Sequence, residues 1–155
     1  MKAGLSAMAG LAAMAGLAAM LLLAGCSADR APQVPDGRVA ATLGGVDLVL
    51  EVADTDAERA VGLMGRTSVP AGTGMVFRYD APNEGRYYMF QVPIPLRAVF
   101  IRSGRVVSSV VMPPCGLTDP AACPTYGADG PFDTVVETDP ETLPDIQPGV
   151  RFALL

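Results

Sequence analysis

Histidine is absent from the whole chain, and lysine occurs once, at Lys2. Without an imidazole base, the Ser-His-Asp and Cys-His arrangements for nucleophilic catalysis are excluded. Zinc sites with a histidine ligand are excluded for the same reason. The glycines also lack the spacing and the following lysine of a phosphate-binding loop. The sequence therefore argues against the commonest hydrolase, zinc-dependent and nucleotide-binding sites.

Basic residues are also few. The chain has 11 Lys and Arg residues against 16 Asp and Glu residues, which gives a net charge of −5. They form no cluster that could neutralise a phosphate backbone, so we expect no nucleic-acid partner. Because a net negative charge gives no attraction to anionic lipid, attachment to a membrane would depend on acyl chains.

The first 25 residues have the pattern of a lipoprotein signal peptide. Lys2 gives a short positive start, residues 3–25 carry no charge, and the segment ends in Leu23-Ala24-Gly25-Cys26. Small residues suit a signal-peptidase cleavage site, and a cysteine after Leu-Ala-Gly resembles the lipobox of bacterial lipoproteins. An uncleaved membrane helix fits less well, because the run is mostly Ala and Gly, which insert weakly. We expect Cys26 to be lipidated and the rest of the chain to lie outside the cytoplasm, anchored to the cell membrane or envelope.

The remaining 130 residues are enough for one domain and too few for two. Residues 26–37 contain Pro32 and Pro35 without an apolar cluster, which is typical of a flexible tether. We therefore expect residues 38–155 to form a single domain.

Two cysteines follow the lipobox, Cys115 and Cys123. Outside the cytosol such a pair is expected to form a disulfide. A redox role fits less well, because active dithiols usually sit two residues apart at a helix N-terminus. A Cu(I) site that also uses Met89 and Met112 is a further alternative, since thioethers and thiolates select that ion. Isolated methionines are more often core residues, so we expect a structural disulfide and no metal or cofactor.

Local patterns predict one short helix. Thr55 and Glu58 have the spacing of a capping box, so we expect a helix that runs to about Met64, with Ala60, Val61 and Met64 facing inward. The segment 113–131 is rich in proline and is expected to be a long loop, and residues 140–149 a turn with one short helical piece at most.

The rest of the domain is expected to be β-structure. Residues 46–52 alternate between apolar and other side chains, and Ser103-Gly104 suits a hairpin turn. The expected strands are 38–43, 46–52, 74–79, 86–91, 97–102, 105–112, 132–138 and 150–155. Strands without intervening helices favour an antiparallel sheet. The predicted fold is a compact, barrel-like, mainly β domain, or α+β with one short helix.

Six polar side chains fall inside or beside apolar runs and form the candidate ligand-binding set. They are Arg59, Arg66, Tyr88, Gln91, Arg97 and Tyr126. Arg59 on the capped helix and Arg66 beyond its end could face an anion or a carboxylate. The alternative is that the set consists of ordinary surface arginines and edge-strand tyrosines. The acidic pairs at 54–58 and 139–141 suit helix caps and turns, so we assign no catalytic residue.

Three segments in series resemble the small bacterial and archaeal domains of domain-of-unknown-function family 192. They are Glu58-Arg59-Ala60-Val61-Gly62-Leu63-Met64-Gly65-Arg66 with Pro70 and Gly74-Met75-Val76-Phe77, then Tyr88-Met89-Phe90-Gln91-Val92-Pro93-Ile94-Pro95-Leu96, then Pro114-Cys115 with Cys123-Pro124-Thr125-Tyr126. The resemblance covers about residues 38–155. It implies a compact mainly β domain with one early helix, often exported, and no established activity.

The chain departs from the family pattern at two places. Tyr88-Met89-Phe90-Gln91 stands where the family usually has Trp-Met-Lys-Asn, and Arg97 stands where it usually has Asp or Ser. A polar site built on the family's Asn and Asp would be altered or lost in this chain.

We expect a membrane-tethered, non-catalytic binding or accessory domain whose partner is a small ligand or an envelope protein. Two alternatives remain open at this point. One is an enzyme of unfamiliar type that uses Arg66, Gln91 and Tyr126 in a cleft, and the other is a Cu(I)-handling protein.

Overall fold

The computed structural model describes residues 37–144 and 146–155. The signal peptide, Cys26 and all of the tether except Gly37 lie outside the described residues, and they stay predictions. The described residues belong to one compact unit. No helix in the described residues is long and apolar enough to cross a membrane.

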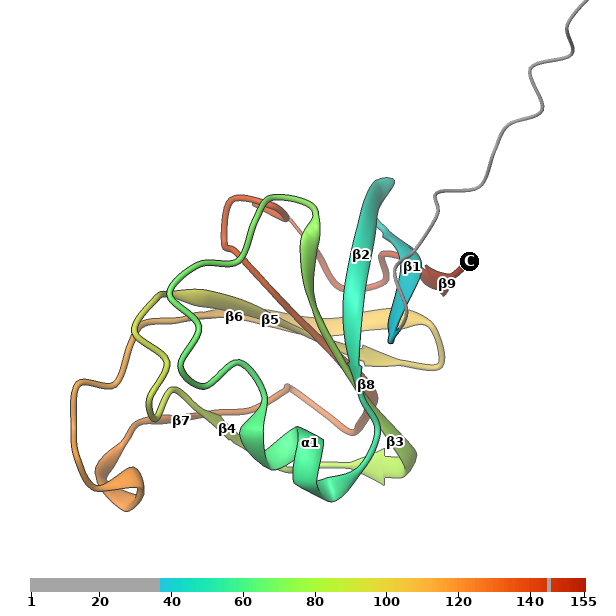
Figure 1. The fold of residues 1–155 in the computed structure, drawn as a ribbon. Coiled ribbons are helices and arrows are strands. Elements are labelled where there is room, and N and C mark those ends of the chain that lie inside the picture. Colours follow the sequence, from blue (N-terminus) through green and yellow to red (C-terminus); the bar gives the residue numbers. More distant parts are fainter. Residues whose placement is uncertain (1–36, 145) are drawn as a thin grey trace, which may run out of the picture. The chain divides into compact units, whose positions relative to one another are not determined.

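The domain is mainly β with one short α-helix, as predicted. In order, its elements are β1 (Arg38–Leu43), β2 (Val46–Ala53), α1 (Asp56–Val61), β3 (Thr73–Asn83), β4 (Tyr87–Tyr88), β5 (Leu96–Arg102), β6 (Arg105–Met112), the 3-10 helix η1 (Pro120–Ala122), β7 (Thr125–Tyr126), β8 (Phe132–Thr138) and β9 (Phe152–Leu154). One sheet has the order β6-β5-β8-β3-β2-β1-β9 and curls into a half-barrel, while β4 and β7 form a small second sheet (Figure 1).

One strand pair departs from the antiparallel expectation. β2 and β3 run parallel, with Glu51 opposite Met75 and Ala53 opposite Phe77. Parallel neighbours need a crossover that returns the chain to the same edge, and residues 54–72, which include α1, make that crossover. A helix of six residues followed by a loop carries no local sign of this role, so the sequence did not reveal it.

The helix begins as predicted. Thr55 Oγ1 accepts a hydrogen bond from the Glu58 N–H at 3.2 Å, and the Glu58 carboxylate accepts one from the Thr55 N–H at 3.0 Å. These two bonds are the capping box. The helix ends earlier than predicted, at Val61, where Gly62 follows with a φ of 47°.

The prediction that Ala60 and Val61 face inward was wrong. No residue of α1 is buried, and Val61 is 59% exposed. Met64 is half-buried, and Leu63 supplies the buried apolar side chain. Because the chain turns at Gly62, the residue after the turn fills the core in place of the helix face.

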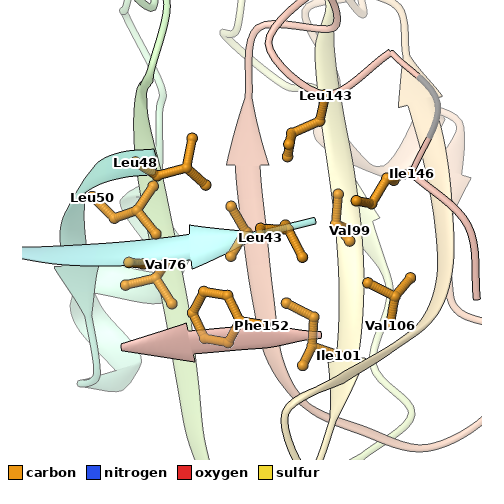
Figure 2. Close-up of a cluster of buried hydrophobic side chains, with 12 residues drawn as sticks. Leu43, Leu48, Leu50, Val76, Val99, Ile101, Val106, Leu143, Ile146 and Phe152 are labelled. Carbon is orange, nitrogen blue, oxygen red and sulfur yellow. The ribbon is translucent and has the colours of Figure 1, made fainter. Parts of the chain in front are cut away.

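The main sheet is covered on both faces. The first cluster contains Leu43, Leu50, Val76 and Val99 among others (Figure 2). Val136 of β8 also belongs to it. The second, on the opposite face of β3, β5 and β8, contains Leu63, Met75, Phe77, Met89, Ala98, Phe100, Phe132 and Val135 among others. Strands covered on both faces read as nearly continuous apolar runs, which explains the sequence of β5 and the Val135-Val136 pair inside β8.

The predicted bond between Cys115 and Cys123 is present, with the two Cα atoms 5.7 Å apart. The segment it closes is more ordered than the long loop expected, because it contains η1 and is followed by β7. β7 pairs with β4, so Tyr126 lies opposite Tyr87. This short pairing depends on contacts far apart in sequence and has no local apolar pattern.

We predict that Gly74→Ala lowers the free energy of unfolding by more than about 2 kcal/mol, because overpacking forces the backbone to move. A Cβ at Gly74 would lie 2.1 Å from the carbonyl oxygen of Glu137. Gly116→Ala is the matched control, since nothing lies within 4 Å of its added Cβ, and it should change stability by less than about 0.5 kcal/mol. Urea unfolding measures both, and equal stability of the two variants would contradict the close approach of β3 to β8.

Candidate functional site

A row of side chains crosses one face of the sheet where β2, β3 and β8 lie side by side. Glu51 lies opposite Met75, and Met75 lies opposite Glu137. Residues paired across neighbouring strands point to the same face, and the strands are about 4.8 Å apart. Two carboxyl groups therefore flank a methionine on the face that carries the second apolar cluster.

Glu51 is held between two guanidinium groups. Its Oε2 accepts a hydrogen bond from Nη2 of Arg66 at 2.6 Å, and its Oε1 accepts one from Nη2 of Arg38 at 3.1 Å. The Arg66 side chain nevertheless remains 48% exposed. One carboxylate against two arginines leaves a net positive charge, carried on a guanidinium that solvent can reach.

Two grooves meet at the Glu51–Arg66 pair. The smaller has a volume of about 30 Å³ and is lined by Glu51, Leu63, Arg66, Ser68, Val69, Pro70, Thr73 and Gly74. The larger, which we call the Arg66 groove, has a volume of about 430 Å³ and is lined by Glu51, Val52, Ala57, Glu58, Val61, Gly62, Arg66 and Met75. Mostly apolar walls with a few polar groups are typical of small-molecule sites of this size.

The turn after α1 shapes this groove. Gly62 has a φ of 47°, and a Cβ there would lie 3.3 Å from the ring of Phe77, so a larger residue would be both strained and crowded. The N–H of Gly65 donates to the carbonyl oxygen of Gln91 at 2.8 Å. These contacts hold the loop that carries Arg66 beside β2.

Glu58 lines the same groove, and its Oε2 already accepts hydrogen bonds that cap the helix. It accepts hydrogen bonds from the N–H groups of Asp54 and Thr55 and from Thr55 Oγ1. These bonds, the Thr55 N–H first, hold the pKa of Glu58 below its usual value. Glu58 is therefore ionised and committed to capping the helix.

Arg59 is a structural residue in this arrangement. Its Nη1 donates to the carbonyl oxygens of Asp54 and Arg78 at 2.6 and 2.7 Å, and its Nη2 pairs with Asp56. Its guanidinium also lies 4.8 Å from the ring centre of Tyr79, a distance typical of a cation–π contact. These bonds attach α1 to β3 and leave Arg59 turned away from the groove.

Arg97 also binds main-chain groups. Its guanidinium donates to the carbonyl oxygens of Pro144 at 3.3 Å and Pro140 at 3.5 Å. It alternates along β5 with Leu96 and Ala98 of the second cluster, so it points to the opposite face from Glu51 and Glu137. Arg97 therefore fixes the segment before β9 and lies apart from the Arg66 groove.

The other three candidates lie around the β4–β7 sheet. Gln91 is exposed with a φ of 56° and is joined to Gly65 through its backbone. Tyr88 is exposed and stacks on Phe90, with ring centres 6.3 Å apart. Tyr126 is half-buried on β7. Of the six candidates, Arg66 is the one that lines the two grooves described above.

Glu137 was missed at the sequence level. The residue is 5% exposed and is one of three buried polar or charged residues, with Ser108 and Thr138, in the part of the chain that the structure describes. Burial alone raises the pKa of Glu137 to about 8. In the sequence, the burial of Glu137 was indicated only by its position directly after the apolar pair Val135-Val136, in a strand otherwise rich in β-branched residues. Groups with strongly shifted pKa values concentrate at functional sites.

Residues 37–144 and 146–155 contain no group of three or more His, Cys, Asp or Glu side chains that could hold a metal ion. Cys115 and Cys123 are bonded to each other, so neither sulfur is a free thiolate that could bind a metal ion in this form. Met89 and Met112 are both buried in the second cluster.

Comparison with known proteins gives a family and a fold. The sequence model of domain-of-unknown-function family 192, described as uncharacterized ACR, matches residues 39–153. A structure from Sinorhizobium meliloti, provisionally described as a transcription regulator, has a TM-score of 0.66 and 22% identity, covering 79% of this chain and 98% of that one. A Novosphingobium aromaticivorans protein of unknown function has a TM-score of 0.64 and 28% identity, covering 81% and 94%. No curated protein matches the sequence.

We predict that stability falls as the pH rises from about 5 to 8. The folded state keeps the proton on Glu137 up to a pKa of about 8, whereas the unfolded state releases it near 4.5. The free energy of unfolding should therefore fall by about 1.4 kcal/mol per pH unit in this window. Since the chain has no histidine, no other side chain ordinarily titrates there.

Urea unfolding at pH 5, 6.5 and 8 measures the effect. Glu137→Gln should remove the slope, and Glu141→Gln, at an exposed carboxylate, should keep it. A slope that is equal in wild type and Glu137→Gln would show that Glu137 is not its source.

Proposed function

The chain belongs to domain-of-unknown-function family 192, and we propose that it is an exported lipoprotein whose β domain binds a small amphipathic carboxylate in the Arg66 groove. The anchor is supported by the uncharged segment 3–25 and the Leu23-Ala24-Gly25-Cys26 sequence. Two or three acyl chains on Cys26 would be sufficient for stable attachment. The domain would then work outside the cytoplasm at the end of the tether 26–37.

The single observation that carries the binding proposal is the half-exposed Arg66 guanidinium at the edge of an apolar groove. Val52, Val61 and Met75 line this groove, so an aliphatic ligand group would lose contact with water there. A carboxylate can take up the remaining N–H donors of Arg66 in a paired, charge-assisted geometry. The charges of Arg38 and Arg66 are balanced by those of Glu51 and Glu58, so it is the exposed N–H donors of Arg66, the cation in the groove lining, that favour an anionic head group over a cationic one.

These residues are better suited to binding a ligand than to catalysing a reaction. Glu51 is paired with two arginines and Glu58 accepts three hydrogen bonds, so both carboxylates are already engaged by other groups of the protein. Glu137 can hold a proton, but Met75 lies between it and Glu51 in the register. The groove therefore has the groups to hold a ligand and lacks a proton acceptor aimed at it.

For the anchor, we predict that Cys26→Ser leaves the full chain unlipidated and largely uncleaved when it is expressed in a bacterium. Intact-mass measurement of the membrane fraction shows whether residues 1–25 and the acyl chains are present. Ser27→Ala is the control and should be processed as the wild type is. Normal processing of Cys26→Ser would contradict the lipobox.

For the groove, we predict that sodium octanoate binds the Pro32–Leu155 unit and that octylammonium does not. Arg66→Gln should weaken octanoate binding at least tenfold, as expected for loss of a charge-assisted hydrogen bond of about 1.5–3 kcal/mol. Isothermal titration calorimetry measures the affinities.

Arg102→Gln is the matched control for this experiment. Arg102 is also partly exposed, at 40%, and pairs with one carboxylate, Asp133. Equal octanoate affinity in Arg66→Gln and wild type, or binding lost equally in Arg102→Gln, would exclude Arg66 as the anchor of the ligand.

A further inference from the structure

Two arginines lie opposite each other beside the turn that joins β5 and β6. Arg105 of β6 and Arg151 form an isolated antiparallel bridge. The N–H of Phe152 donates to the carbonyl oxygen of Gly104 at 2.9 Å, and the N–H of Val106 donates to that of Val150 at 2.9 Å. These two bonds flank the arginine pair, so it occupies a non-hydrogen-bonded position, where opposite side chains come closest.

This position places two like charges side by side. Directly opposite Cβ atoms in such a pair are about 4.5–5.5 Å apart, and like charges there destabilise the sheet. Nη1 of Arg105 donates to the carbonyl oxygen of Gly149 at 3.1 Å, which fixes its direction. The nearby carboxylate, Asp133, is already used by Arg102 at 3.7 Å and by the N–H of Ser103 at 2.9 Å. Within the described residues, Arg151 has no acidic partner at salt-bridge distance.

The paired arginines line a polar groove of about 360 Å³. Its lining consists of Ser103, Gly104, Arg105, Arg151 and Phe152. Both arginines and Ser103 are exposed. Ser103 and Gly104 have φ angles of 49° and 72°, which form a tight hairpin turn and fix the hydroxyl-bearing residue beside the two guanidinium groups. The groove shares no residue with the Arg66 groove.

We propose that the Arg105–Arg151 groove is a binding site for a phosphate group. A tetrahedral dianion between two guanidinium forks relieves their repulsion and takes paired hydrogen bonds from each, which is the geometry that arginine provides. The Ser103 hydroxyl supplies a further donor. The whole chain has a net charge of −5. The two arginines therefore form a local region of positive charge that attracts an anion although the protein as a whole repels it. The phosphate can come from a soluble molecule or from a lipid head group.

The test uses inorganic pyrophosphate on the Pro32–Leu155 unit at low ionic strength. We expect saturable binding by calorimetry and a higher melting temperature than in chloride at equal ionic strength. Arg105→Gln and Arg151→Gln should each weaken binding at least tenfold. Arg78→Gln, which removes one exposed positive charge from β3, should leave it within twofold.

A second readout separates a binding site from a merely structural pair. Without pyrophosphate, Arg151→Gln should melt no lower than the wild type, because it removes a like-charge contact. No pyrophosphate binding, or binding that is unchanged in both arginine variants, would overturn the proposal.

Sedimentation with lipid vesicles identifies the source of the phosphate. Binding to phosphatidylglycerol vesicles and not to phosphatidylcholine vesicles, lost in Arg105→Gln, assigns a lipid head group. Pyrophosphate binding without vesicle binding assigns a soluble phosphate compound. Failure of octanoate binding leaves this result unaffected, because the two grooves have separate linings.

Discussion

The parallel pairing of β2 with β3 is the constraint on which the candidate site depends. It forces residues 54–72 to cross from one end of the sheet to the other, and this crossover carries both α1 and Arg66. Because the chain turns at Gly62, Leu63 enters the core and Val61 stays outside. The space between the helix end and β2 is the Arg66 groove. A direct hairpin between these strands would leave neither helix nor groove.

Burial of the sheet on both faces sets the environment of the site. Apolar side chains fill β3, β5 and β8 on each side, and Glu137 interrupts this pattern at a central position. Burial of a carboxyl costs stability, and it raises the pKa of Glu137 above the range of ordinary carboxyl groups. Since the chain has no histidine, we expect Glu137 to make the stability of this domain depend on pH near neutrality.

The sequence predicted what local physics determines. The capping box of Thr55 and Glu58, the Ser103-Gly104 turn and most strand positions depend on residues close together in the chain, and the structure contains them. The partners of Arg59 and Arg97 are main-chain carbonyls at Arg78 and Pro144, and no side-chain pattern reveals these. The β2–β3 pairing, the exposed helix face and the burial of Glu137 follow from tertiary packing, so they could not be derived from local patterns.

The most direct test of carboxylate binding is an NMR titration of the isotope-labelled Pro32–Leu155 unit with sodium octanoate. We expect saturable amide shift changes that gather at the lining of the Arg66 groove, above all at Val52, Val61, Gly62, Arg66 and Met75. Shift changes confined to other surfaces, or none up to millimolar octanoate, would contradict the assignment of this groove as the binding site.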